Sequence, residues 1–385
     1  MKNQAEKVKT PSVLFNGYVF SATGYGTAAR AYVHAFHRAN IGLSVIDRAH
    51  EQCRNIPDPL VDSLLNRPLD VDFCVCHTEP LDFASMRPAF SHLIALTTWE
   101  SDTLPADFAN VLNEVREIWT PSSYNAEAFR KQLKAPVFHL PHPVHVPPPT
   151  IPESQEIENF FNLKKDDFVF LNVATWQERK NIPATIEAFF RAFPREPNIK
   201  LFIKTSFYFT DAQKANAQVV KALKRAGVSL TPREIDARLK IFQVPWTEEL
   251  MATLMRRADC YVALHRSEGW CYPLFDAACA GIPVITTAYS GPMDYLDPKF
   301  HHLVNYKLVH ATRGDDPESF RFSPEMLWAD PDILHAAAQM RVICNNKQKA
   351  RKLAETGAAL LREKYSFESV GNMARKRLQQ LAQKD

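Results

Sequence analysis

Short apolar runs alternate with amphipathic stretches along most of the 385-residue chain. Before residue 145, the apolar runs predict strands at 11–16, 43–47, 71–76, 92–99, 117–122 and 137–144. Between them, the spacing of apolar residues predicts helices, including 27–38 and 124–133. Short apolar strands that alternate with helices pair in parallel, so the pattern indicates an α/β fold with a doubly wound sheet.

The same alternation starts again after the proline-rich segment HPVHVPPPTIPES (142–154). This segment can form neither a helix nor a central strand, so it predicts a stiff linker and a domain boundary. Strands are predicted beyond it at 167–175, 199–206, 239–245, 260–267 and 282–291. Helices are predicted at 181–193, 248–258, 274–281, 332–345, 347–364 and 366–383, and one helix or a helix pair is predicted at 211–225. Two α/β halves of this kind bind ligands at the carboxyl ends of their strands.

Charge and cysteine content narrow the class of partner and the compartment. The 46 Lys and Arg residues against 43 Asp and Glu residues give a net charge of +3. This balance argues against nucleic acid as the main partner but allows weak attraction to an anionic membrane surface. The sequence has no signal-like apolar segment and no membrane-spanning stretch, and its seven cysteines lack zinc-type spacing. We therefore expect a cytoplasmic protein, with peripheral contact at the inner face of the membrane as an option.

Glycine is scarce, with 11 residues where average usage would give roughly 27. Gly24 and Gly26 precede a predicted helix, where free N–H groups and the helix dipole attract phosphate. A dinucleotide site would need G-x-G-x-x-G directly after the strand, and the third glycine is missing. Two interpretations remain for this pair, a loop with positive φ or a loop that lines a phosphate-bearing ligand.

The densest signal lies between residues 265 and 296. Glu268 follows a predicted strand, and Asp276 lies eight residues further on, in the next predicted helix. We expect free backbone N–H groups at 269–271, and a carboxylate at each end of such a turn can hold sugar or ribose hydroxyls. The alternative is that Glu268 caps the helix and that Asp276 is a surface charge.

This segment reads EGWCYPLFDAACAGIPVI and resembles the donor-site signature of retaining glycosyltransferases of family 4, which have the GT-B fold. The family pattern is E-G-F-G-x-P-x-x-E-A-x-A-x-G-x-P-V-I. Other similar features follow in the same order along the chain, namely the loop near Tyr25, WTPSSYN (119–125), the PHPV before the linker and WADPD (328–332).

The resemblance implies an α/β, GT-B architecture in which two Rossmann-like domains face a central cleft. Residues 1–148 would bind the acceptor, residues 149–365 would bind the nucleotide sugar, and the helix at 366–385 would pack back on the first domain. The implied activity is retaining transfer of a sugar from a UDP- or GDP-sugar to a hydroxyl acceptor, in glycan, polysaccharide or glycolipid assembly. The acceptor and the oligomeric state are left open.

The resemblance also implies roles for single residues. Glu268 would contact the transferred sugar, beside the amides of the following residues, and Asp276, where the family has Glu, would hold the ribose. The base would be read by backbone near Val244. The remaining donor-binding candidates from this carry-over are Gly24, Gly26, Gly269, Trp270, Cys271 and Tyr272.

The departing diphosphate needs positive charge close to it. WQERKN (176–181) supplies Arg179 and Lys180, whereas the family's arginine five residues before the lysine is Thr175 here. Lys204 either adds a third cation or is a solvated strand end. Two cations can take the place of a metal at the diphosphate, so we expect neither a metal nor another cofactor.

In the first half, His77 and Glu100 each end a predicted strand, where α/β proteins place functional groups. Each either touches substrate or structures a loop. The family is thought to use the donor phosphate as base, so no protein nucleophile is required. The rival interpretations are a sugar-nucleotide epimerase, a glycogen-type phosphorylase and a non-catalytic subunit that binds nucleotide sugars.

Overall fold

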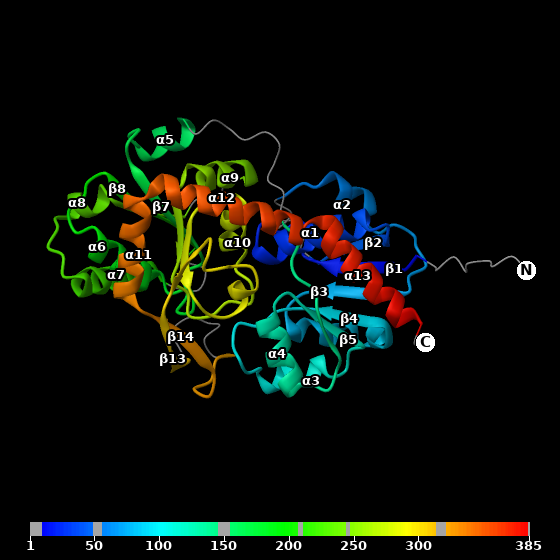
Figure 1. Ribbon diagram of the computed structural model, residues 1–385. Coiled ribbons are helices and arrows are strands. Elements are labelled where there is room, and N and C mark those ends of the chain that lie inside the picture. The colour runs from blue at the N-terminus through cyan, green and yellow to red at the C-terminus, as the bar shows by residue number, and fades with distance from the viewer. Residues whose placement is uncertain are drawn as a thin grey trace, which may run out of the picture. The chain divides into compact units, whose positions relative to one another are not determined.

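The computed structural model describes residues 10–48, 56–144, 155–206, 211–243, 247–312 and 321–383 (Figure 1). The chain forms two compact units, each described here by itself. The first comprises Met1–Trp99, Leu104–His145 and Arg362–Asp385, and the second comprises Glu100–Thr103 and Val146–Leu361. Most of the predicted linker and Val244 lie outside the described residues.

The first unit is built on a six-stranded sheet in the order β2-β1-β3-β4-β5-β6. Its strands are β1 (Ser12–Gly17), β2 (Gly42–Asp47), β3 (Phe73–His77), β4 (Leu93–Leu96), β5 (Glu117–Thr120) and β6 (Val137–His139). All of the pairings are parallel. Helices cover both faces of such a sheet, which is why its strands read as continuous apolar runs.

The helices of the first unit come from both ends of the chain. They are α1 (Gly24–Arg38), α2 (Pro59–Leu64), the 3₁₀ segment η2 (Pro80–His92), α3 (Ala106–Leu112), α4 (Ser123–Gln132) and α13 (Phe367–Ala382). Helix α13 packs along α1, where the rings of His34 and Phe367 stack at 5.4 Å (Figure 1). Arg377 Nε on α13 also lies 2.8 Å from Oε1 of the buried Glu117 on β5. The C-terminal helix is therefore an integral part of the first unit.

The second unit repeats this plan with a six-stranded sheet in the order β12-β11-β10-β7-β8-β9. Its strands are β7 (Phe168–Val173), β8 (Ile199–Lys204), β9 (Leu239–Phe242), β10 (Cys260–Ala263), β11 (Val284–Thr287) and β12 (His302–Val304). The described pairings of this sheet are parallel as well. The predicted α/β class with doubly wound parallel sheets is confirmed in both units.

The helices of the second unit pack against its sheet and enclose a large apolar core. They are α5 (Gln155–Phe161), α6 (Ile182–Ala192), α7 (Ala212–Ala226), α8 (Pro232–Asp236), α9 (Glu248–Arg257), α10 (Tyr272–Cys279), the 3₁₀ segment η3 (Gly291–Asp294) and α11 (Ile333–Asn345). Helix α12 (Lys347–Lys364) runs from the second unit into the first. Phe189 of α6 and Met340 of α11 are fully buried in the core, against strand residues such as Leu201.

The structure differs from the predicted pattern in the length of some strands and in elements that the pattern did not predict, such as the short helices α2, α3, α5 and α8. Predicted strands are shortened at their carboxyl ends, so that 260–267 ends at Ala263 and 239–245 ends at Phe242, because the following residues leave the ladder as loops. An antiparallel hairpin, β13 (Tyr306–His310) and β14 (Leu327–Pro331), was not predicted. Its first strand is largely exposed and therefore carries no apolar run. Within the described residues, no helix combines the length and apolar character that a membrane span needs.

Candidate functional site

Three neighbouring strands of the second sheet end at the same edge, and their ends carry most of the predicted donor-site residues. The strands are β10, β7 and β8, which are adjacent in the sheet. Glu268 lies in the loop after β10, Arg179 and Lys180 lie in the loop after β7, and Lys204 is the last residue of β8. Parallel pairing alone therefore brings together residues that are far apart in sequence.

Glu268 is the centre of a buried charge cluster, with 3 % of its surface exposed. Lys180 Nζ donates hydrogen bonds to both of its carboxylate oxygens, at 2.6 and 2.9 Å. Arg179 Nη1 lies 3.1 Å from Oε2 of the same carboxylate. Burial by itself raises the pKa of Glu268, but the two cations outweigh it and hold the pKa at about 2. The carboxylate is therefore ionised throughout the physiological range.

Arg179 connects this cluster to two further groups. Its Nη1 donates a hydrogen bond to the carbonyl oxygen of Ser267 at 2.9 Å. Its Nη2 lies 3.4 Å from Glu100 Oε1. Glu100 belongs to the short segment that clusters with the second unit, so the predicted residues Glu268, Lys180, Arg179 and Glu100 form one group. In this group two cations face two carboxylates.

The main chain around Glu268 is held by the segment after β11. Gly291 N donates a hydrogen bond to the carbonyl oxygen of Glu268 at 2.9 Å. A Cβ at Gly291 would clash with the carbonyl oxygen of Gly269, so only glycine permits this approach. Cys271, the N-cap of α10, has a φ of +70°, which non-glycine residues rarely adopt. The loop is thus a close-packed and strained turn, as is common at functional sites.

The aromatic residues of the predicted donor loop are packing residues. Trp270 is 3 % exposed, and its ring lies 4.8 Å from that of Tyr295 and 5.0 Å from that of Phe275. Tyr272 is also buried, at the first position of α10. The side chain of Glu268 does not cap α10, because Cys271 occupies the N-cap and the helix has no side-chain cap. What this turn presents to a ligand is therefore backbone.

Asp276 lies on α10 and is not a surface charge. Its Oδ1 is buried and has no hydrogen-bond partner among the described residues. Burial raises the pKa of Asp276 to about 8, with a smaller contribution from Glu248 at the start of α9. A buried acceptor without a partner is unusual and fits a site that a ligand hydroxyl completes.

Lys204 at the end of β8 lies next to the segment that follows β7 and contains Thr175. Lys204 is the register partner of Val173, and its carbonyl oxygen accepts a hydrogen bond from Ala174 N at 3.1 Å. Thr175, which follows directly, is half-buried. Partial burial of Lys204 lowers the pKa of its ammonium group. Lys204 therefore places a positive charge near Thr175, which is itself uncharged.

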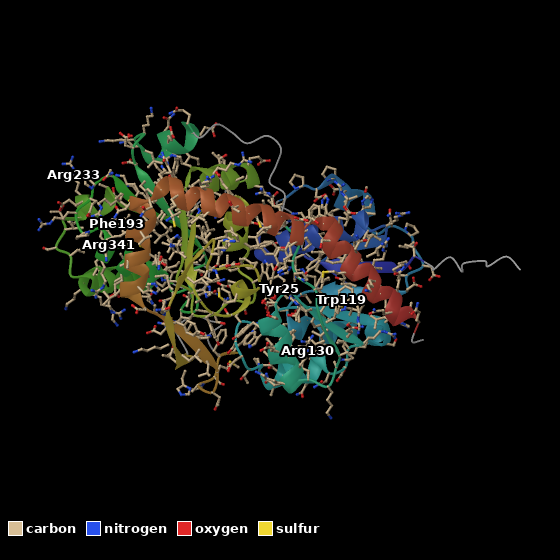
Figure 2. All side chains as sticks on the ribbon, in the orientation of Figure 1. Tyr25, Trp119, Arg130, Phe193, Arg233 and Arg341 are labelled. Atoms are coloured by element: carbon tan, nitrogen blue, oxygen red, sulfur yellow. The ribbon has the colours of Figure 1, made fainter. Side chains whose placement is uncertain are left out.

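His77 ends β3 in the first unit, where its described neighbours include several aromatic rings. Its side chain is 3 % exposed. The ring of Tyr25, labelled in Figure 2, lies 5.2 Å from it, and those of Tyr32 and His142 lie 5.9 and 6.2 Å away. Burial lowers the pKa of His77 to about 3, so the imidazole is neutral at pH 7. Its Nδ1 has no hydrogen-bond partner among the described residues.

Gly24 and Gly26 in the first unit do not have the positive φ that one of the two interpretations requires. Gly24 and Gly26 lie inside the first turn of α1, and neither is among the glycines with positive φ, so the positive-φ interpretation is wrong. Gly26 is required because a Cβ there would clash with the carbonyl oxygen of Ser21, whereas nothing lies within 4 Å of a Cβ at Gly24. Gly26 N already donates to Thr23 Oγ1 at 3.3 Å.

Several contributors to the site carry no recognisable sequence signal. The serine before Gly291 and the glutamate at the start of α9 are ordinary residues in the sequence, and their proximity to Glu268 and Asp276 depends on the tertiary structure. Among the described residues, no group of three or more His, Cys, Asp or Glu side chains is placed to hold a metal ion.

The segment that contains this edge of the sheet matches the model of a known protein family. Residues 153–307 match the family model described as "Glycosyl transferases group 1". The match covers less than half of the chain, but it contains β7 to β12 and the residues Arg179, Lys180, Glu268 and Asp276. Comparison with curated proteins gave no significant match.

Solved structures resemble the whole chain. Sucrose-phosphate synthase from Thermosynechococcus elongatus is 14 % identical with a TM-score of 0.67, and the alignment covers 98 % of this chain and 100 % of that one. Anabaena Alr3699/HepE in complex with UDP and glucose is 11 % identical with a TM-score of 0.64, covering 96 % and 100 %. A glycosyltransferase from Rickettsia africae is 10 % identical with a TM-score of 0.68, covering 98 % and 100 %. These likenesses show the fold, which is the α/β architecture of GT-B glycosyltransferases.

Proposed function

We propose that this protein is a glycosyltransferase that moves a sugar from a UDP- or GDP-sugar to a hydroxyl acceptor with retention of anomeric configuration. The observation that carries the proposal is the buried cluster of Glu268, Lys180 and Arg179 at the strand ends of the segment that matches the glycosyltransferase family. The structural relative that holds UDP and glucose supports a nucleotide-sugar donor.

The cluster matches the charge change of this reaction. When the bond between the sugar and the diphosphate breaks, negative charge grows on the diphosphate oxygens, and prearranged cations lower the barrier. Lys180 and Arg179 are held in place by Glu268 before any ligand arrives. The incoming diphosphate competes with Glu268 for Lys180. A carboxylate oxygen of Glu268 then becomes available to a hydroxyl of the transferred sugar.

The nucleotide would lie along the same edge of the sheet. Asp276 supplies the buried oxygen without a partner that the ribose hydroxyls satisfy. Lys204 supplies positive charge beside Thr175, in place of the arginine that the family pattern has there. The backbone amides of residues 269–271 face the donor, as the buried side chains of Trp270 and Tyr272 leave only main chain for this purpose.

We further propose that the enzyme works without a metal or other cofactor, because Arg179 and Lys180 offer two cations at the proposed diphosphate position. The cytoplasm, or the inner face of a membrane, is the proposed location. His77 and its aromatic neighbours in the first unit are the proposed contacts of the acceptor, since a neutral imidazole suits a neutral hydroxyl compound.

The test is nucleotide release from a panel of UDP- and GDP-sugars, with and without candidate acceptors, and identification of the products. Glu268→Gln should lower turnover at least tenfold, because the cations lose the carboxylate that holds them. Glu363→Gln, which removes a carboxylate from an exposed position on α12, is the matched control and should not change the rate. Conversion of the donor without added acceptor would indicate an epimerase or a hydrolase. If no donor is turned over and none raises the melting temperature, the proposal is wrong.

A further inference from the structure

Ser290 has an unusual backbone conformation for its residue type. It follows β11, is 6 % exposed, and has a φ of +65° with a ψ of −152°. This combination is almost confined to glycine, because a Cβ collides with the neighbouring main chain. Glycine at position 290 would relieve the strain, so the serine side chain must supply something that glycine lacks.

The serine hydroxyl is bonded to the residue at the centre of the candidate site. Glu268 N donates a hydrogen bond to Ser290 Oγ at 2.9 Å. The next residue, Gly291, donates its N–H to the carbonyl oxygen of Glu268, also at 2.9 Å. Two consecutive residues therefore hold the amide and the carbonyl of Glu268 at the same time. The close approach of Gly291 to Gly269 leaves this segment little freedom to shift.

The threonine hydroxyls of β11, the strand that precedes Ser290, make a different kind of contact. Thr286 Oγ1 donates to the carbonyl oxygen of Ala263 at 2.8 Å, and Thr287 Oγ1 donates to that of His265 at 2.7 Å. These bonds hold β11 to the end of β10. The bond of Ser290 lies further along the loop and acts on the residue whose carboxylate contacts Lys180 and Arg179.

We infer that Ser290 is a positioning residue for Glu268. Its hydroxyl fixes the main chain of Glu268, so that the carboxylate stays between the two cations and points to where the sugar binds. The strained backbone is the conformation in which this hydroxyl reaches the Glu268 amide. The catalytic part of this inference rests on the proposed function, while the hydrogen-bonded clamp itself does not.

Three variants of the full-length protein separate positioning from a purely structural role. Ser290→Ala keeps the strain and loses the hydroxyl, whereas Ser290→Gly loses both. Thr286→Val removes a buried hydroxyl bond from the same strand but does not touch Glu268. For each variant we would measure kcat and the donor KM, the melting temperature, and amide hydrogen exchange of the peptide that contains Glu268.

Positioning predicts that activity and stability change independently. Both Ser290 variants should show a kcat about tenfold lower with a KM within about twofold of the parent, and faster exchange of the Glu268 peptide. The melting temperature should fall for Ser290→Ala but not for Ser290→Gly, because glycine relieves the strain. Thr286→Val should melt at a lower temperature and keep its kcat.

Two results would overturn the inference: a kcat that follows the melting temperature across the three variants, or unchanged exchange and kcat in both Ser290 variants. A parent protein that turns over no donor overturns the proposed function instead. In that case, exchange of the Glu268 peptide decides alone, since unchanged exchange in Ser290→Ala and Ser290→Gly shows that the clamp does not hold Glu268.

Discussion

The carboxyl end of β10 in the second unit and the carboxyl end of β3 in the first unit are comparable places, each at an interior strand of a six-stranded parallel sheet. Glu268 near the first of these ends is ionised and held by Lys180 and Arg179. His77 at the second end is neutral and surrounded by the rings of Tyr25, Tyr32 and His142. One architecture therefore carries two kinds of strand end, one with paired charges and one with a neutral imidazole among aromatic rings.

This difference fits the proposed function, in which the second unit would bind an anionic nucleotide and the first unit would bind a neutral acceptor. Each sheet is parallel and six-stranded and is packed against helices, so the fold does not explain the contrast. It arises from a few side chains at the strand ends, which is where α/β proteins carry their function.

The largest expected effect separates the two strand ends directly. Lys180→Ala should lower kcat about 100- to 1,000-fold, because the growing charge on the diphosphate loses a prearranged cation. His77→Phe should leave the affinity for UDP within about twofold of the parent, since an aromatic ring is kept and no charge is removed. Calorimetric titration with UDP and steady-state kinetics measure both. Equal weakening of UDP binding by the two substitutions would contradict the comparison.

Gly291 in the second unit and Gly26 in the first are both glycines at which an added methyl group would meet a carbonyl oxygen. Gly291→Ala and Gly26→Ala should each reduce the free energy of unfolding by about 3 kcal/mol, because main chain must move. Only the change at Gly291 should also accelerate hydrogen exchange around Glu268. Gly24→Ala is the control and should be neutral or stabilise by up to about 1 kcal/mol, since a Cβ there meets open space in a helix. Urea unfolding gives the values.

The pH dependence of stability should show the neutral character of His77. Its folded pKa of about 3 lies below the unfolded value of 6.5, so the unfolded state takes up a proton first as the pH falls. Stability is therefore lost on acidification between these two values. At pH 5, the parent should have lost about 2 kcal/mol more than His77→Phe, relative to pH 7. Identical pH profiles for the two proteins would show that His77 is not buried in neutral form.

The smallest expected effect concerns Asp276, where the pKa shift has the opposite direction. With a pKa of about 8, Asp276 carries a proton at pH 7 and loses it by pH 9. The carboxylate accepts hydroxyl hydrogen bonds more strongly than the acid does, so UDP affinity should rise about threefold over this range. Asp276→Asn should remove that rise. A rise of the same size in Asp276→Asn would place the titrating group elsewhere.

The sequence pattern predicts the parallel sheets well, because strands that are buried on both faces read as continuous apolar runs. It does not reveal β13, whose residues are largely exposed. Glu268, Lys180 and Arg179 follow from the motif, but the contact between Glu268 and Lys180 spans 88 positions and depends on the adjacency of β10 and β7. The strain at Ser290 has no signal either, since serine gives no indication of a positive φ.

Helix α13 has a consequence for how the chain is made. The first unit begins with β1, yet it also contains α13, which follows the whole second unit in the sequence. The buried residues of α13 include Val370, Ala374 and Leu378. During synthesis, part of α1 therefore stays uncovered until residues 367–382 have left the ribosome. A fragment that stops before residue 367 should expose the side of α1 that α13 covers, and should aggregate. A variant in which α13 is fused after residue 145 should keep this side covered.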